Sequence, residues 1–447
     1  MTDSATMPRM ADDLMADEAI RDPHTFYRWL RELSPIHWNA RWGGWVLTRY
    51  EDVVTVLRDS KTFSSDRMGF LAKELSPEEQ EPIFPIFDVL GRWMVFVDPP
   101  THTTLRMLMN RLFTPKAVEG YRPTVREIVD EALDDVEPKG RMDVVREFAY
   151  RIPMTVILDL LGTPDLDRTL IKEWSEMLGT FFFIRADEPR RREIATQGVQ
   201  SLLDYITPVI EDRDKNRGES DLISVLLRAE DEGKVSRQDV IATVILLVFG
   251  GHETTMNLIA NGTLALMQAP DQWQLMAERG EEVAKSGVEE LLRFDGSVKA
   301  TVRWAREDFE LDGHHIRAGD RILLALSAAN RDPEQFDDPD RLDLLRSPNP
   351  HVAFAHGIHV CIGAPLARLE AQETFKGLTT RLPRPESEIP IDQLPYFRTV
   401  VGRALKQLPV RWLDADGDAR EVVIDGAEGC PVEAITVYDE SGERIAP

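Results

Sequence analysis

Cysteine is scarce in this chain: among 447 residues there are only Cys361 and Cys430. Two cysteines do not make a disulfide framework, so the class of small, disulfide-rich secreted domains is excluded. The N-terminus also lacks a basic segment followed by an apolar run, and we therefore expect no signal peptide.

Long apolar runs and positive net charge are lacking as well. The longest apolar run, residues 240–251, is shorter than the about 18 residues that a membrane-spanning helix needs. A formal net charge of −25 opposes binding to nucleic acid or to an anionic membrane, although a local basic patch is compatible with it. With 43% hydrophobic residues the chain can still bury a large core, and we predict a soluble cytoplasmic protein.

The hydrophobic spacing predicts helix over most of the chain and a few short strands. A helix is expected at 23–33, a β-hairpin at 36–48, further helices through most of 117–233, and a β-rich segment at 298–324. We therefore predict a mainly α fold with small β-sheets.

Three parts of the chain are predicted to be less regular. Residues 65–97 combine several prolines with large apolar side chains, which indicates a long loop that packs on itself or lines a pocket. Residues 1–22 are polar and are expected to form a loosely ordered lead-in, and residues 413–447 an acidic extension with short strands. Residues 23–412 then form one domain.

The most unusual stretch surrounds Cys361, which lies between Gly357 and Gly363 and just before a predicted helix that starts at Ala364. A helix N-terminus favours a thiolate over a thiol, because free backbone N–H groups and the helix dipole face the sulfur. The glycines let the backbone approach a flat ligand closely. This chemistry favours a thiolate bound to a metal, with haem iron as the leading candidate. Taken alone, a single cysteine in such a loop is more often structural.

A long helix is predicted from a capping box at 236–239 to about Gln268, before Pro270. Its apolar character on most sides predicts burial. Residues 250–255, Gly-Gly-His-Glu-Thr-Thr, are poor choices for the interior of a buried helix, and a buried Glu is costly unless it is hydrogen-bonded. We interpret them as functional. A close contact between helices is the alternative.

Two further pairs are ordinary when taken singly. His102 and Arg106 lie four residues apart on one face of a predicted helix, where a solvated pair is the simpler interpretation. Glu290 and Arg293 are i, i+3 partners, which on a surface helix contribute only a few tenths of a kcal/mol.

These motifs gain meaning from their order along the chain: His-x-x-x-Arg, Gly-Gly-His-Glu-Thr-Thr, Glu-x-x-Arg and Phe-x-x-Gly-x-His-x-Cys-x-Gly. The order resembles bacterial cytochrome P-450, a family of haem-thiolate monooxygenases, over about residues 20–412. The cysteine motif is the specific part. The resemblance implies a single helix-rich domain with a long central helix over haem b.

Site residues carried over from the resemblance fall into three groups. Those implied to bind haem are Cys361 as the iron ligand, the propionate-binding His102, Arg106, Arg303 and His359, and Gly250, Gly251, Phe354 and Gly363 around the iron and its sulfur ligand. Glu253 and Thr254 match the acid–alcohol pair that delivers protons to bound oxygen, and the two helix glycines leave room for dioxygen. Glu290 and Arg293 are implied to form a buried network with Arg341 that holds the cysteine loop. Ala355 stands where the family usually has glycine, which asks only that the position tolerate a Cβ.

Substrate and partners are implied less specifically. The family's substrate-lining segments map onto 65–97, 181–183, the helix through Gly250, 298–302 and 399–405, and their apolar character favours a small hydrophobic or aromatic substrate. Lys299, Arg398 and Arg403 lie in or beside them; we expect internal salt bridges there rather than a substrate carboxylate.

The electron source is expected to be separate, because the chain has no flavin-type or iron–sulfur-type segment. The resemblance implies a ferredoxin and its reductase, which a basic patch at Arg106, Arg111 and Arg368 could receive. A peroxygenase driven by hydrogen peroxide and a haem-based sensor without turnover are the alternatives. Glu253 and Thr254 argue against the peroxygenase.

Overall fold

The long helix α14 (Arg237–Gln268) crosses the middle of the molecule in the computed structural model, which describes residues 12–110, 112–183, 188–218, 221–412, 437–438 and 444–446. Its N-terminus is the predicted capping box: the Ser236 side chain accepts from the Asp239 N–H, and the Asp239 carboxylate accepts from the Ser236 N–H at 2.9 Å. Pro270 then opens the next helix, α15 (Pro270–Asp295). Both predicted ends of the long helix are confirmed.

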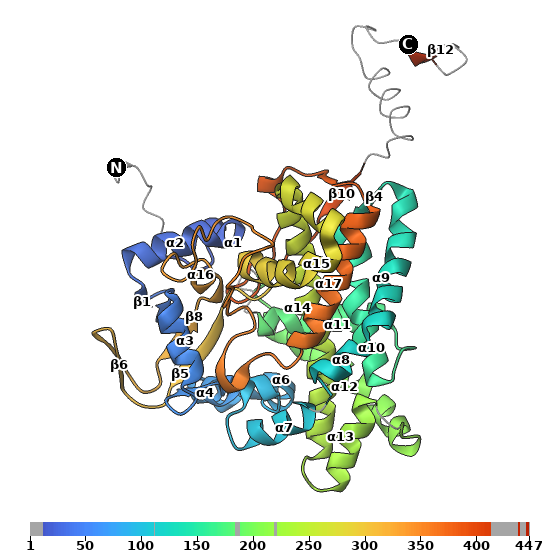
Figure 1. The fold of residues 1–447 in the computed structure, drawn as a ribbon. Coiled ribbons are helices and arrows are strands. Elements are labelled where there is room, and N and C mark those ends of the chain that lie inside the picture. Colours follow the sequence, from blue (N-terminus) through green and yellow to red (C-terminus); the bar gives the residue numbers. More distant parts are fainter. Residues whose placement is uncertain are drawn as a thin grey trace.

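Helices cover α14 on several sides (Figure 1). In the described residues α14 packs against α10, α12, α13, α15 and α17. By length and composition α14 could span a membrane, but 67% of its apolar window is buried inside the protein, as in a core helix. The remaining helices are α1 (Asp17–Arg21), α2 (Pro23–Leu33), α3 (Tyr50–Arg58), α4 (Arg67–Glu74), α5 (Pro77–Gln80), α6 (Phe84–Leu90), α7 (Thr101–Asn110), α8 (Pro115–Glu119), α9 (Arg122–Val136), α10 (Arg151–Leu161), α11 (Arg168–Phe182), α12 (Arg191–Lys215), α13 (Leu222–Asp231), α16 (Leu326–Ala329) and α17 (Ala364–Arg381), with the short turns η1 (Glu81–Ile83), η2 (Met94–Phe96), η3 (Glu137–Lys139), η4 (Val144–Ala149), η5 (Gly357–His359) and η6 (Ile391–Gln393).

The largest sheet has the order β1-β2-β8-β5-β3 and lies with the N-terminal helices on the opposite side of the molecule from α9 and α10 (Figure 1). Its strands are β1 (Ile36–Asn39), β2 (Gly44–Leu47), β8 (Arg321–Leu324), β5 (Thr301–Ala305) and β3 (Phe63–Ser64). The predicted hairpin is confirmed, with Ile36 paired to Leu47. β5 runs antiparallel to β8, which carries Arg303 to the edge of the central cavity.

Three smaller sheets complete the described strands. They are β4 (Arg141–Asp143), β10 (Pro409–Arg411) and β9 (Glu386–Ser387); β6 (Phe309–Leu311) with β7 (His314–Ile316); and β11 (Val437–Tyr438) with β12 (Arg444–Ala446). In the acidic extension we expect strands at 422–424 and 432–438; the end of the second is present as Val437–Tyr438, and the rest of both ranges lies outside the described residues. The mainly α fold with small sheets is confirmed.

Two segments differ from the prediction. Residues 65–97 form a chain of short helices, α4 to α6 with η1 and η2, instead of a long loop, because a proline stands in the first turn of α5, η1 and α6, where its missing N–H is harmless. Residues 12–22 are not a loose lead-in: Leu14 and Ile20 are buried, and the Asp12 carboxylate contacts the His37 ring at 2.8 Å. The division of the chain at 22 and 412 stays a prediction.

Candidate functional site

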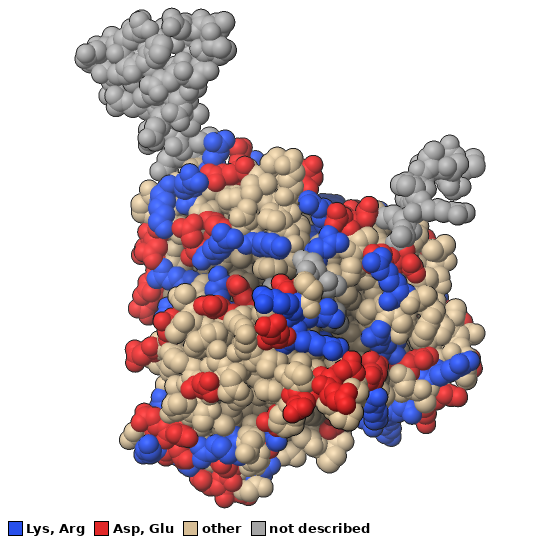
Figure 2. All heavy atoms as spheres, turned by 180° about the vertical axis from the view of Figure 1, so that it is seen from behind, with Lys and Arg blue, Asp and Glu red and all other residues tan. Residues whose placement is uncertain are grey.

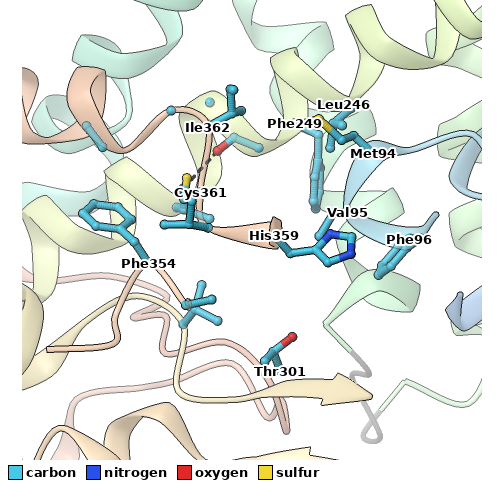
Figure 3. A pocket seen from close by; sticks show the side chains of 18 of the residues that line it. Met94, Val95, Phe96, Leu246, Phe249, Thr301, Phe354, His359, Cys361 and Ile362 are labelled. Carbon is cyan, nitrogen blue, oxygen red and sulfur yellow. Dashed lines mark hydrogen bonds between the residues drawn. The ribbon is translucent and has the colours of Figure 1, made fainter. Parts of the chain in front are cut away.

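A largely apolar cavity lies between α14 and the loop that carries Cys361 (Figure 3). Each of the five segments predicted to line a substrate pocket contributes to it, with Phe96, Phe182, Phe249, Val298 and Val401 among the lining residues. The large apolar side chains of 65–97 were predicted either to pack within the segment or to line a pocket, and both occur. Trp93 is fully buried, and Met94, Val95 and Phe96 face the cavity.

Cys361 lies between η5 and α17, with its side chain open to this cavity. Its backbone N–H donates to the Phe354 carbonyl at 3.0 Å, and its sulfur accepts from the N–H groups of Gly363 and Ala364. These bonds and the nearby cations Arg106 and Arg368 lower the pKa of the thiol, but burial outweighs them and raises it. The expected preference for the charged sulfur is therefore not met by the protein alone; a coordinated metal ion would supply it.

The cysteine loop depends on two residues in left-handed backbone conformation. Gly357 has φ +73°, and a Cβ there would lie 2.4 Å from the Leu57 carbonyl oxygen, so only glycine fits. Ala355 has φ +59°, a conformation that costs an alanine about 1 kcal/mol. Alanine at this position therefore strains the backbone, whereas we expected only that the position would have to accommodate a Cβ atom.

Four basic side chains converge on one end of the cavity. His102 on α7 and His359 have ring centroids 4.2 Å apart, and the Nε2 atoms of both are buried without a hydrogen-bond partner. Burial and the cations Arg303 and Arg106 lower the pKa of His359 to about 3. Both guanidinium groups line the same end. Unpartnered donors and repelling cations fit a ligand that brings two carboxylates, as the propionates of haem do.

The middle of α14 presents Thr254 to the cavity and holds Glu253 beside it in the helix. Thr254 Oγ1 donates to the Gly250 carbonyl at 2.9 Å. Glu253 is buried and is not among the residues that line the cavity; its carboxylate lies 3.8 Å from His252 Nε2. The predicted acid–alcohol pair is thus adjacent in the helix, but only the alcohol faces the cavity.

The two helix glycines have different reasons to be small. A Cβ on Gly250 would meet only the Leu246 side chain, at 3.9 Å, so this position is open. A Cβ on Gly251 would lie 3.0 Å from Cγ1 of Ile157 on α10. The alternative of a close contact between helices therefore accounts for Gly251, and free space for a small molecule is found at Gly250.

Glu290 and Arg293 form a fully buried pair, not a surface pair. Arg293 donates from Nε and Nη2 to the carboxylate at 2.7 Å each. The third charged member is Arg346, whose Nε lies 3.1 and 3.2 Å from the two carboxylate oxygens. Arg341 takes part in the network as predicted, but through its backbone carbonyl, which accepts from Arg293 at 3.2 Å.

Sequence reasoning missed two cavity residues. Glu370 on α17 is buried, its Oε2 has no hydrogen-bond partner, and burial raises its pKa well above the usual range. Its position four residues after Leu366, on the same buried face, was the available indication. Arg67 on α4 was hidden among the aromatic residues of its segment.

The three cations considered as partners for a substrate carboxylate, Lys299, Arg398 and Arg403, bind groups of the protein itself. Arg398 pairs with Asp17, and Arg403 with Asp295 at 3.2 Å, as expected of internal salt bridges. Lys299 is buried and donates to the Ala19 carbonyl at 3.5 Å instead of to a carboxylate. None of the three lines the cavity.

Comparison with known proteins agrees with this geometry. The family model "Cytochrome P-450" matches residues 45–378. The biotin biosynthesis cytochrome P-450 of Bacillus subtilis is 36% identical over 409 residues, 90% of this chain and 99% of the relative. The cytochrome P-450 monooxygenase PikC of Streptomyces venezuelae is 37% identical over 418 residues, 92% of this chain and 95% of the relative.

Solved structures are similar over the same length. P450BioI in complex with an acyl carrier protein ligated to hexadec-9Z-enoic acid has a TM-score of 0.81 and 34% identity, covering 89% of this chain and 99% of that one. The myxobacterial CYP267B1 in complex with myristic acid has a TM-score of 0.80 and 35% identity, covering 91% and 100%. With a cysteine open to a cavity, a basic cluster for two carboxylates and these relatives, the chain belongs to the cytochrome P-450 family of haem b monooxygenases.

Proposed function

We propose that this cytoplasmic enzyme inserts one atom of dioxygen into a small hydrophobic or aromatic molecule, using electrons from a separate ferredoxin and its reductase. The observation that carries the proposal is the cavity itself: Cys361 opens into it on one side, Thr254 faces it from α14, and its remaining walls are mostly apolar. Such a space favours an apolar substrate and excludes water from the reacting atoms.

Each residue around the haem has a role that follows from its contacts. Haem b, when bound, supplies the iron on which dioxygen is activated. Cys361 would hold the iron, and the N–H groups of Gly363 and Ala364 orient its sulfur. His102, His359, Arg106 and Arg303 would hold the propionates, whose charge would balance the two guanidinium groups.

Proton delivery falls to α14. The Thr254 hydroxyl holds a proton at the cavity wall, bonded at rest to the Gly250 carbonyl. It can turn toward an oxygen atom in the cavity and donate that proton. Glu253, the next residue in the buried helix, would resupply it after a rotation of its own side chain, because that carboxylate does not face the cavity at rest.

The relatives support an apolar substrate. The solved P450BioI holds a carrier protein with a hexadecenoic acid, and CYP267B1 holds myristic acid. Both ligands combine a long apolar chain with a carboxyl group or its derivative. A ligand of this kind would lie against the aromatic wall.

The ferredoxin would dock on the face near Cys361. Of the expected basic patch, Arg106 lies beside the cavity, Arg368 donates to Glu289 at 2.6 Å and so is partly neutralised, and Arg111 lies outside the described residues. Figure 2 shows the back of the molecule relative to Figure 1; there Lys and Arg side chains are interspersed with Asp and Glu, so basic groups occur on the surface despite the net charge of −25. Local complementarity can steer an acidic partner.

The proposal is tested with Cys361→Ser and Thr254→Ala. Reduced wild-type protein with carbon monoxide should show the red-shifted Soret band of thiolate ligation, and Cys361→Ser should lose it. Thr254→Ala should keep the band while product per electron pair falls roughly tenfold or more, with electrons diverted to peroxide. Thr263→Ala is the matched control, because Thr263 makes the same backbone bond in α14, to Ile259 at 2.7 Å, away from the cavity. Unchanged coupling in Thr254→Ala, or faster product formation with hydrogen peroxide alone, would overturn the proposal.

A further inference from the structure

Arg67 is a cation in the cavity wall that the haem site does not explain. Three arginines line the cavity among the described residues. Arg106 and Arg303 stand with His102 and His359, where two propionates would balance them. Arg67 instead begins α4 and lies among the aromatic side chains, with its guanidinium carbon 5.4 Å from the Phe96 ring centroid and 5.5 Å from that of Phe181.

The guanidinium of Arg67 contacts carbonyl groups in place of a carboxylate. Its Nη1 donates to the Phe182 carbonyl at 2.8 Å and its Nη2 to the Phe181 carbonyl at 3.1 Å. A guanidinium has five N–H donors in a planar fork, so these two bonds leave three available. No ion pair joins Arg67 to an acidic side chain of the described residues.

Two buried arginines of the molecule differ from the partly buried Arg67 in their partners. Arg293 pairs with Glu290, and Arg403 with Asp295, in both cases with the carboxylate buried beside the cation. A desolvated charge is costly unless it is paired, and Arg67, which is partly buried, has no carboxylate partner among the described residues. Burial lowers its pKa to about 10, which still leaves it charged at neutral pH.

We propose that Arg67 binds the carboxylate of an otherwise apolar substrate. The proposal rests on the proposed function and narrows it from hydrophobic molecules in general to apolar carboxylic acids. The carboxylate would accept two N–H bonds from the free part of the fork, and the apolar remainder would extend along Phe96 and Phe182 into the cavity. The aromatic rings flanking the guanidinium would exclude water from this ion pair and so strengthen it.

A structural role for Arg67 competes with this proposal. Phe181 and Phe182 are the last residues of α11, whose free carbonyl groups attract a cation. In that role Arg67 would only fasten α4 to the end of α11. Such a fastener would affect stability, and it would give no preference between a carboxylic acid and the corresponding alcohol.

The test compares myristic acid with tetradecan-1-ol, which has the same chain and no charge. Their dissociation constants are measured by spin-state titration and by calorimetry on the haem-containing protein at pH 8. For wild type we expect the acid to bind more tightly than the alcohol. Arg67→Leu should raise the dissociation constant of the acid roughly ten- to a hundredfold, which is the range expected for hydrogen bonds to charged groups. It should change the dissociation constant of the alcohol by no more than about twofold. Arg67→Lys should retain part of the preference, because it keeps the charge and loses the fork.

One further variant serves as a control. Lys73→Met removes an exposed cation from the same helix outside the cavity and should leave both dissociation constants unchanged.

The outcomes separate the inference from the function on which it rests. Equal affinity for acid and alcohol in wild type, or an equal loss of both in Arg67→Leu, would overturn the carboxylate site and assign Arg67 to fastening α11. Oxidation of tetradecan-1-ol with ferredoxin and reductase would sustain the proposed function in that case. Absence of any ferredoxin-driven product from either compound, despite an Arg67-dependent preference in binding, would instead count against the monooxygenase proposal.

Discussion

The two sides of the cavity are built from different interactions. Behind the cysteine loop, Glu290 accepts hydrogen bonds from Arg293, Arg346, Asn349 and the Asp343 N–H, and both members of the central ion pair are fully buried. Across the cavity, the wall is a cluster of aromatic rings whose centroids lie 4.8–6.2 Å apart, Trp93, Phe96, Phe182, Phe183 and Phe249.

The difference matches what each side must do. A network of charge-assisted hydrogen bonds has one satisfactory arrangement, so it fixes residues 330–349, the segment that leads into the cysteine loop. Aromatic and aliphatic side chains can repack at modest cost, so the other wall can be adapted to new substrates. The polar side therefore holds the framework in place, and the apolar side supplies an adaptable wall for substrate.

The largest loss of stability is expected when the hydrogen-bond network around Glu290 is disrupted. Glu290→Gln removes the charge that balances Arg293 and Arg346, leaving two buried or nearly buried cations with carbonyl acceptors only. Stability should fall by about 3–5 kcal/mol, as for other buried pairs that lose one partner, and haem should be lost with it. Urea unfolding followed by circular dichroism and by the Soret band would measure both.

Glu289→Gln is the matched control for this prediction. Glu289 is the neighbouring residue and accepts from Arg368 at 2.6 Å and from His351 at 3.0 Å, but it is partly exposed. Glu289→Gln should lower the free energy of unfolding by about 1–2 kcal/mol. Equal costs for the two variants would contradict the special position of Glu290 behind the loop.

Several elements of the fold could be predicted from the sequence because capping residues, turns and helix starts are determined by neighbouring residues. The capping box at Ser236, the hairpin at 36–48 and the helix start after Cys361 depend on residues within a few positions of one another. The haem-side residues His102, Arg303 and His359 were brought together from three separate segments by their order along the chain, and the structure does gather them.

What could not be predicted depends on burial and on long-range contacts. Glu290 and Arg293 look like a surface pair at i, i+3, and only the packing of the 331–349 loop over them makes the pair buried. The guanidinium group that contacts Glu290 belongs to Arg346 and not to Arg341. The loop turns the Arg341 carbonyl toward Arg293 and the Arg346 side chain toward Glu290. Arg67 and Glu370 gave no sign of facing a cavity that is formed by segments distant in the sequence.

His252 is a polar exception on the apolar side, and it should make stability depend on pH. The side chain is fully buried on α14, its Nδ1 contacts the Val248 carbonyl at 2.6 Å, and the nearest charged groups are Glu253 and Lys172. Burial lowers its pKa from 6.5 to about 4. Between these values the unfolded chain takes up a proton that the folded protein does not, so stability falls as pH falls through this window, by roughly 3 kcal/mol in total.

The measurement compares urea unfolding of wild type and His252→Gln at several pH values from 4 to 7. The variant should lose less stability on acidification, whereas His315→Gln, at an exposed position on β7, should follow wild type. A wild-type slope retained in His252→Gln would mean that carboxylates, and not this imidazole, set the acid sensitivity of the helix.

The smallest effects distinguish the two glycines of α14 and show how far the apolar side adapts. Gly250→Ala adds a methyl group that meets only Leu246 at 3.9 Å, so better helix propensity should stabilise the protein by about 0.5–1 kcal/mol. Gly251→Ala gains the same propensity but pushes a methyl group to 3.0 Å from Ile157, and a net loss of about 1 kcal/mol is expected from overpacking. Adding Ile157→Val should return part of that loss, because it removes the Cδ1 atom that would lie at 3.1 Å. If the two glycine variants had the same stability, the contact between α10 and α14 would be as adaptable as the open wall, and rigidity would be confined to the polar side of the cavity.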